Sequence, residues 1–78
     1  MSEFKIDQCL DLKGVPCPLN FVKTKLTLEG MDTGSMLEVL LDDGDPIINV
    51  TASVKEEGHQ ILKVEKASEY WKLVIKKQ

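Results

Sequence analysis

The stretch FKIDQCLDLKGVPCP, residues 4–18, changes its hydrophobic pattern part-way along. From Phe4 to Leu12, apolar and polar residues alternate, which is typical of a strand with one face in the core. Gly14–Val15–Pro16 breaks this pattern, and Pro18 suits the first position of a helix, where a missing N–H costs nothing. We therefore predict a strand over 4–12 and a helix from Pro18, with Cys17 at or next to the N-cap.

The apolar spacing after Pro18 predicts that this helix runs to about Glu29 and stops at Gly30, which suits the C′ position. Its most buried stripe is expected to contain Phe21, Thr24, Leu28 and Met31. A second apolar arc beside that stripe contains Leu19, Val22 and Leu26.

The rest of the chain predicts three more strands and one more helix. The apolar run Met36–Leu41 is typical of an interior strand. Asp45 is a candidate N-cap and Pro46 a first helical residue for a helix over about 46–57. Strands over 60–65 and 70–76 should pair as a hairpin. The order βαβαββ predicts an α/β two-layer sandwich, with two helices on one face of a four-stranded mixed sheet.

Size and composition exclude several classes of protein. A chain of 78 residues has room for one core and no deep substrate pocket, so we interpret residues 1–78 as one domain. No stretch approaches the roughly 20 apolar residues of a membrane helix, and residues 1–5 lack the features of a signal peptide. We therefore expect a complete cytoplasmic protein that does not contact a membrane.

The charges are segregated along the chain. All ten basic residues are lysine and the net charge is −3, which argues against direct binding of nucleic acid. Residues 29–57 carry one lysine and eight acidic residues, whereas the segments on either side are basic. The acidic middle is expected to be a solvated face. The basic excess near residues 13–25 and in the final hairpin suggests partners with acidic surfaces.

Two cysteines do not make a disulfide framework, and with the lone His59 they do not complete a four-ligand zinc set. We expect no metal and no cofactor. His59 follows a helix-ending glycine and is interpreted as structural. Asp42, Asp43 and Asp45 are interpreted as turn and cap residues, and Trp71 as a core residue.

Cys17 is the candidate reactive residue. At a helix N-terminus, unpaired N–H groups and the helix dipole stabilise a thiolate, so its pKa should fall below the usual value of about 8.5. Gly14, Pro16 and Pro18 should fix the loop that presents it. A buried, inert Cys17 is the alternative interpretation.

The segment LDLKGVPCP, residues 10–18, resembles the signature of the TusA/SirA family of small sulfur carrier proteins, in which a strand leads into a C-P-x-P motif. LEVL at 37–40, GHQIL at 58–62 and VIKK at 74–77 also resemble the family's order. The resemblance implies a sulfurtransferase-type persulfide carrier, rather than a self-contained enzyme, that accepts sulfur on Cys17 from a cysteine desulfurase or rhodanese-like protein. It also implies an acceptor protein in tRNA thiolation, molybdenum cofactor synthesis or sulfur oxidation. We expect a monomer.

The chain departs from the motif at Asn20, which stands where the family has its second proline. Asn20 restores a backbone N–H in the first helical turn and adds an amide that can form a hydrogen bond near the sulfur. Partner docking is expected at Val15, Leu19, Val22 and Lys23. Two other functions stay open: a non-catalytic regulatory or interaction module, and a thiol redox protein that uses Cys9 and Cys17.

Overall fold

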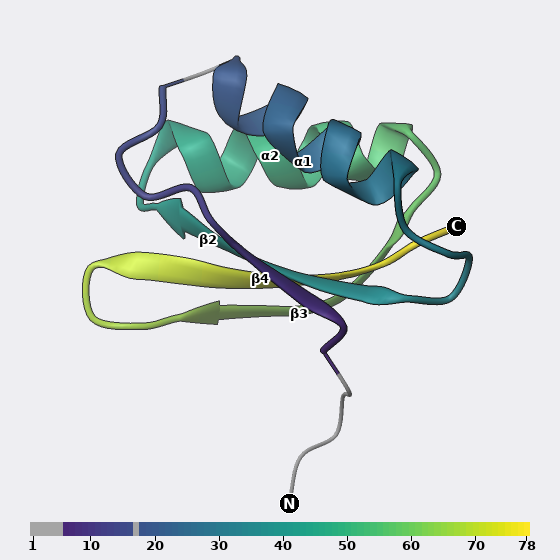
Figure 1. Cartoon of the computed structure of the whole chain (residues 1–78). Coiled ribbons are helices and arrows are strands. Elements are labelled where there is room, and N and C mark those ends of the chain that lie inside the picture. Colours follow the sequence, from purple (N-terminus) through teal and green to yellow (C-terminus); the bar gives the residue numbers. More distant parts are fainter. Residues whose placement is uncertain (1–5, 17) are drawn as a thin grey trace, which may run out of the picture.

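Six elements follow one another in the computed structural model, which describes residues 6–16 and 18–78. The predicted βαβαββ order is confirmed, and both helices lie over the same face of the sheet (Figure 1). The elements are β1 (Gln8–Asp11), α1 (Leu19–Glu29), β2 (Met36–Asp42), α2 (Asp45–Glu56), β3 (Gln60–Lys66) and β4 (Tyr70–Lys76).

The four strands form one mixed sheet in the order β1-β2-β4-β3. β1 and β2 are parallel, as expected for two strands joined by a helix, while β4 is antiparallel to both β2 and β3. β2 is an interior strand, as predicted, and β3 and β4 form the predicted hairpin. The carboxyl ends of β1 and β2 therefore meet at one end of the sheet, where the chain passes from β1 to α1.

The core lies between the sheet and the two helices. Along β2, buried residues alternate with partly exposed ones, which places Leu37, Val39 and Leu41 on the helix-facing side. Val50 and Val54 of α2 pack against this side. The cluster is completed by Leu12, Leu28, Met31, Ile47, Leu73 and Ile75.

Residues 4 and 5 of the predicted first strand lie outside the described residues, and within those described the first strand and the first helix are shorter than predicted. Regular strand structure in β1 covers Gln8–Asp11, although the ladder to β2 extends to Leu12, whose N–H donates to the Leu40 carbonyl at 2.9 Å. Pro18 is the N-cap of α1, so the prediction that it begins the helix is wrong by one residue. Its carbonyl accepts a helical bond from Val22 N at 3.1 Å, which is the usual role of an N-cap carbonyl.

The second helix begins at Asp45, one residue earlier than predicted, and Gly44 rather than Asp45 is its N-cap. The φ of Gly44 is 95°, a conformation that glycine adopts without steric cost, so the chain turns into the helix at Gly44. Asp45 then lies in the first turn, where its negative charge interacts favourably with the positive end of the helix dipole.

The end of α1 also differs from the expectation. Gly30 caps the helix with a φ of −89°, so it is not the left-handed C′ glycine that the sequence suggested. The Gly30 N–H caps the helix locally by donating to the Thr27 carbonyl at 3.2 Å, and a further donor comes from the far end of the chain. The Nζ of Lys77 donates to the carbonyls of Leu28 at 2.7 Å and Met31 at 3.2 Å, and its positive charge suits the C-terminus of a helix.

Candidate functional site

The loop between β1 and α1 begins with a tight turn. The Val15 N–H donates to the Leu12 carbonyl at 3.1 Å, and Gly14 within this turn has a φ of 82°. A side chain at Gly14 would meet no atom within 4 Å, so the backbone conformation rather than crowding requires glycine here. The predicted importance of Gly14 for the loop therefore has a conformational basis.

Two carboxylates hold the backbone of this turn. Asp11 accepts a hydrogen bond from Lys13 N at 3.1 Å. Asp42, at the end of β2, accepts one from Gly14 N at 2.7 Å. Sequence reasoning assigned Asp42 to the turn after β2 and missed this contact, which joins residues 28 positions apart. The available signal was the parallel pairing of β1 and β2, which brings an acidic residue at the end of β2 next to the end of β1.

The side chain of Lys13 ties the same turn to β4. Its Nζ lies 4.3 Å from the centroid of the Tyr70 ring, within the range of a cation–π contact. Tyr70 is the register partner of Asp42 on β2. The turn is thus held by contacts to β1, β2 and β4 together, and the chain continues from it through Pro16 towards α1.

Cys17, the predicted nucleophile, lies outside the described residues, so its low pKa stays a prediction. Its described neighbours are Pro16 in the loop and Pro18, the N-cap of α1. Asn20 N donates to the Pro16 carbonyl at 3.1 Å, a helix-type bond between residues four apart. Pro16 and Pro18 are both exposed, which agrees with a loop presented at the surface.

Asn20 is completely buried, although the sequence suggested only that its amide lies near the sulfur. Its Oδ1 accepts a hydrogen bond from Phe21 N at 2.7 Å, and its carbonyl accepts one from the Thr24 hydroxyl at 2.9 Å. Asn20 thus satisfies a backbone donor in the first turn, where helices have unpaired N–H groups. The buried stripe of α1 is Asn20, Thr24 and Leu28, while the predicted member Phe21 is only half-buried. The spacing of four between these three residues was the available signal.

The predicted docking residues separate into two groups. Leu19 and Val22 are 46% and 42% exposed, and they continue to Leu26 at 61% as an apolar row on the outer side of α1. Lys23 lies beside that row and is also exposed. Val15 differs, because it is half-buried and packs against the core. The structure therefore leaves Leu19, Val22 and Lys23 accessible and uses Val15 to anchor the loop.

Comparison with known proteins identifies the family. The family model for sulfurtransferase TusA matches residues 8–77. The chain belongs to the TusA family. It is 31% identical over 77 residues to the sulfur carrier protein TusA of Allochromatium vinosum, covering 99% of each chain. It is 40% identical over 77 residues, 97% of this chain and 88% of the other, to an Archaeoglobus fulgidus protein named as a candidate sulfur carrier.

A solved structure supports the fold of this TusA-family chain. The crystal structure of a SirA-like protein from Desulfitobacterium hafniense matches with a TM-score of 0.75 and 24% sequence identity. The match covers 88% of this chain and 95% of that one. The predicted two-layer sandwich is therefore also the arrangement of that neighbour.

The other cysteine of this TusA-family chain has different surroundings. Cys9 is an exposed free thiol on the sheet face opposite the helices, and Glu38 is its register partner. Partial desolvation raises the pKa of the Cys9 thiol, and the neighbouring carboxylates of Glu38 and Asp11 raise it further. Cys9 is therefore mostly protonated at neutral pH and a poor nucleophile.

The remaining candidates in the TusA-family chain have structural contacts. The Nδ1 of His59 accepts a hydrogen bond from Gln78 N at 3.1 Å, which agrees with its structural interpretation. Asp43 accepts a hydrogen bond from Trp71 Nε1 at 2.8 Å and pairs with Lys66 at 3.4 Å. These two donors hold the pKa of Asp43 below its usual value, the Trp71 bond having the larger effect. Trp71 is thus only partly a core residue, since its ring edge reaches the surface.

Residues 6–16 and 18–78 contain no group of three or more metal-ligating side chains. In the same residues, neither helix is long and apolar enough to cross a membrane.

Proposed function

We propose that this chain is a sulfur carrier that accepts sulfur as a persulfide on Cys17 and passes it to an acceptor protein. The observation that carries the proposal is the match of residues 8–77 to the TusA family, which includes the loop leading into Cys17. The names of the relatives as sulfur carriers agree with it. The anchoring of Gly14 and Lys13 by carboxylates supports a loop of defined shape just before this residue.

The proposed reaction needs one thiolate and no external oxidant. The Cys17 thiolate attacks the outer sulfur of a persulfide on the donor, and a new S–S bond forms as the donor's S–S bond breaks. The donor cysteine leaves as a thiolate, and Cys17 carries the persulfide. An acceptor thiolate then attacks the outer sulfur, and Cys17 leaves as a thiolate. The numbers of S–S bonds and of electrons are unchanged in each step.

Docking of the donor and acceptor is proposed on the apolar row Leu19, Val22 and Leu26, together with Lys23. Exposed aliphatic side chains beside a nucleophile give a partner apolar area to bury, and Lys23 favours an acidic partner surface. A cysteine desulfurase or a rhodanese-like protein has the required donor chemistry. Val22→Asp and Lys23→Glu should both weaken capture of the donor, whereas Lys76→Glu on β4 adds the same charge change as Lys23→Glu and should not.

The raised pKa of Cys9 argues against a redox function that cycles Cys9 and Cys17 through a disulfide. A thiol held in its protonated form is slow to attack a partner sulfur. An interaction module without thiol chemistry is the other alternative. It predicts that Cys17→Ala leaves partner capture and cellular phenotype unchanged.

Intact mass measurement tests the persulfide proposal. The reduced protein is incubated with a cysteine desulfurase and cysteine, and an increase of about 32 Da per added sulfur, reversed by dithiothreitol, is expected. Cys9→Ser should still gain this mass, and Cys17→Ser should not. The same gain in Cys17→Ser, or none in the unmodified chain, would exclude Cys17 as the carrier.

A further inference from the structure

The outer edge of β1 is an unpaired strand edge. β1 has β2 as its only neighbour in the sheet, so one side of its main chain has no strand partner among the described residues. The N–H of Leu12 donates to the Leu40 carbonyl, and the main-chain groups of successive strand residues point to alternate sides. Those of Leu10 therefore also face β2, whereas the N–H and C=O groups of Cys9 and Asp11 point away from it.

The other edge of the sheet, β3, has features that discourage strand pairing. Its register with β4 shifts between Ile61 and Lys63, and an irregularity of this kind bends an edge strand. Lys63 pairs with Glu65 at 3.3 Å, and Lys66 ends the strand, so charged side chains also protect this edge. Gln8–Asp11 contains no lysine, no proline and no register shift. β1 is therefore the edge that is better suited to accept another strand.

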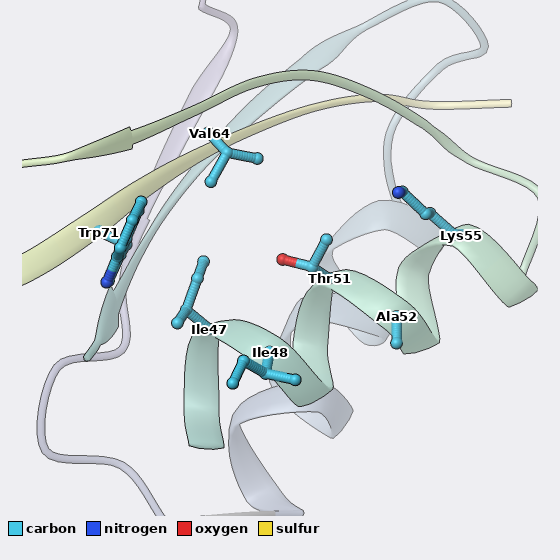
Figure 2. Close-up of a pocket in the computed structure, with 7 residues that line it drawn as sticks. All are labelled: Ile47, Ile48, Thr51, Ala52, Lys55, Val64 and Trp71. Atoms are coloured by element: carbon cyan, nitrogen blue, oxygen red, sulfur yellow. The ribbon is translucent and has the colours of Figure 1, made fainter. Parts of the chain in front are cut away.

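The groove between α2 and the β3–β4 hairpin is a less specific feature. It has a volume of about 430 Å³ and is lined mainly by apolar side chains, with Trp71 at one end and Lys55 at the other, as Figure 2 shows. Because Lys55 is exposed to solvent, its charge does not select one class of ligand. The β1 edge differs, since its main-chain groups and its nearby charges together define what can pair with it.

Carboxylates dominate the sheet face beside the β1 edge. Asp11 is exposed on β1, and Glu38 on β2 is the register partner of Cys9. Both carboxylates raise the pKa of the Cys9 thiol, and each has a larger effect than Lys72 of β4, which lowers it. The electrostatic field at this edge is therefore negative. An added strand with basic side chains on this face would gain opposite-charge pairs across the strands.

A second copy of this chain is a poor occupant of the edge. Antiparallel pairing of two β1 strands would place Asp11 opposite or diagonal to Asp7 or Asp11 of the other copy. Like charges at such positions destabilise a sheet. The charge of the edge thus favours a partner of a different composition.

We propose that the outer edge of β1 accepts an extended basic segment of a partner protein as an antiparallel fifth strand. The N–H and C=O groups of Cys9 and Asp11 would form main-chain hydrogen bonds with this segment, which is the way added strands gain affinity. A lysine or arginine opposite Asp11 would pair with its carboxylate. A second basic residue, opposite Cys9, would extend towards Glu38.

The residue between these two basic positions would be aliphatic. It would lie opposite Leu10, which is partly buried and packs against the core on the helix-facing side. The partner segment therefore has the alternating pattern basic–aliphatic–basic. This proposal does not depend on sulfur transfer, because Cys17 forms none of these contacts.

The peptide TVKVKVT, acetylated and amidated at its ends, is the probe for this edge. It is titrated into isotope-labelled full-length protein, and backbone chemical shifts and amide hydrogen exchange are measured by NMR. Saturable shifts are expected along β1. Exchange of the Cys9 and Asp11 amides should slow, whereas that of Leu10, which already faces β2, should change little.

Two control peptides separate main-chain pairing from charge. TVKVKVT with both lysine main-chain nitrogens methylated keeps its charge but loses two donors, and its affinity should be about tenfold lower. TVEVEVT keeps the donors but reverses the charge, and its affinity should also be about tenfold lower.

Variants of Asp11 test the charge preference from the side of the protein. Asp11→Asn keeps an acceptor for Lys13 N, so the turn is retained, and it should lower TVKVKVT affinity about threefold. Asp11→Lys should lower it further and raise TVEVEVT affinity, whereas Asp32→Asn, at an exposed position outside the edge, should change neither. The absence of a saturable response, slower exchange on β3 instead of β1, equal affinity for the methylated peptide, or an unchanged affinity in Asp11→Lys would overturn the proposal.

Discussion

The carboxylate of Asp42 accepts a 2.7 Å hydrogen bond from the backbone N–H of Gly14, which joins the end of β2 to the turn that precedes Cys17. This bond has a charged acceptor and restrains a glycine in a left-handed conformation. It links the end of an interior strand to the part of the chain where the proposed chemistry occurs. Asp42 therefore connects the stability of the fold to the shape of the loop.

Asp42→Ala should lower the free energy of unfolding by about 1–3 kcal/mol, because Gly14 N loses a charged acceptor. It should also slow sulfur loading of Cys17 in the mass assay, since the turn is less restrained. Asp42→Asn keeps an acceptor oxygen and should lose less in both measurements. Urea denaturation gives the stability, with Asp32→Ala at an exposed position as the control. Equal stability of Asp42→Ala and the unmodified chain would show that the bond contributes nothing.

Cys9 should react more slowly than a free thiol at neutral pH. In Cys17→Ser, where Cys9 is the only cysteine, the rate of alkylation against pH should have its midpoint above the usual thiol pKa of about 8.5. Glu38→Gln removes a carboxylate that opposes the thiolate, so it should move this midpoint down. A midpoint at or below about 8.5 in Cys17→Ser would contradict the assigned surroundings of Cys9.

Protonation of Asp43 in acid should weaken its contacts with Trp71 and Lys66 of the β3–β4 hairpin. Because its folded pKa lies below the usual 3.8, the contribution of its ionised form is present above that value and is lost as the pH falls through the folded pKa. Protonation weakens the bond from Trp71 Nε1, so Trp71 fluorescence should change with a midpoint below 3.8. Asp43→Asn should lack this transition. A midpoint at or above 3.8 in the unmodified chain would show that the Trp71 and Lys66 contacts do not favour the carboxylate.

Lys77 should stabilise α1 from outside the helix. Replacing it with methionine keeps an unbranched side chain but removes the charged donor to the carbonyls of Leu28 and Met31, of which Leu28 keeps its bond from Met31 N, at a cost of about 1 kcal/mol in unfolding free energy. Thermal or urea unfolding measures the loss, and Lys76→Met on β4 is the matched control. A loss no greater than that of the control would mean that water satisfies these carbonyls equally well.

Sequence patterns predicted the elements well because each pattern depends on neighbouring residues. The alternation within Met36–Asp42 and the spacing Ile47–Val50–Val54 determine which side of each element is buried, so the order and layers follow from them. The helix starts were each wrong by one residue, since a proline N-cap and a positive φ at Gly44 depend on how the preceding chain enters the helix.

The missed contacts share a different physical cause. Asp42 with Gly14, and Lys77 with Leu28, join residues far apart in the chain, and no local pattern encodes such pairs. Asn20 was selected from the sequence, but its burial was missed because a polar side chain is usually exposed, and here the contacts of the first helical turn outweigh that preference. The loop residues Gly14, Pro16 and Pro18 could be selected from sequence, but the groups that anchor the loop could not.

The position of β4 has a consequence for the order in which the protein assembles. β4 lies between β2 and β3, although it is made after both, so each of those strands lacks a neighbour until Tyr70–Lys76 has left the ribosome. Until then, the edges of β2 and β3 that β4 later pairs with are free to associate with other chains. The final strand pairs with both of these edges at once, so translation of β4 leaves only the outer edges of β1 and β3 without a neighbouring strand.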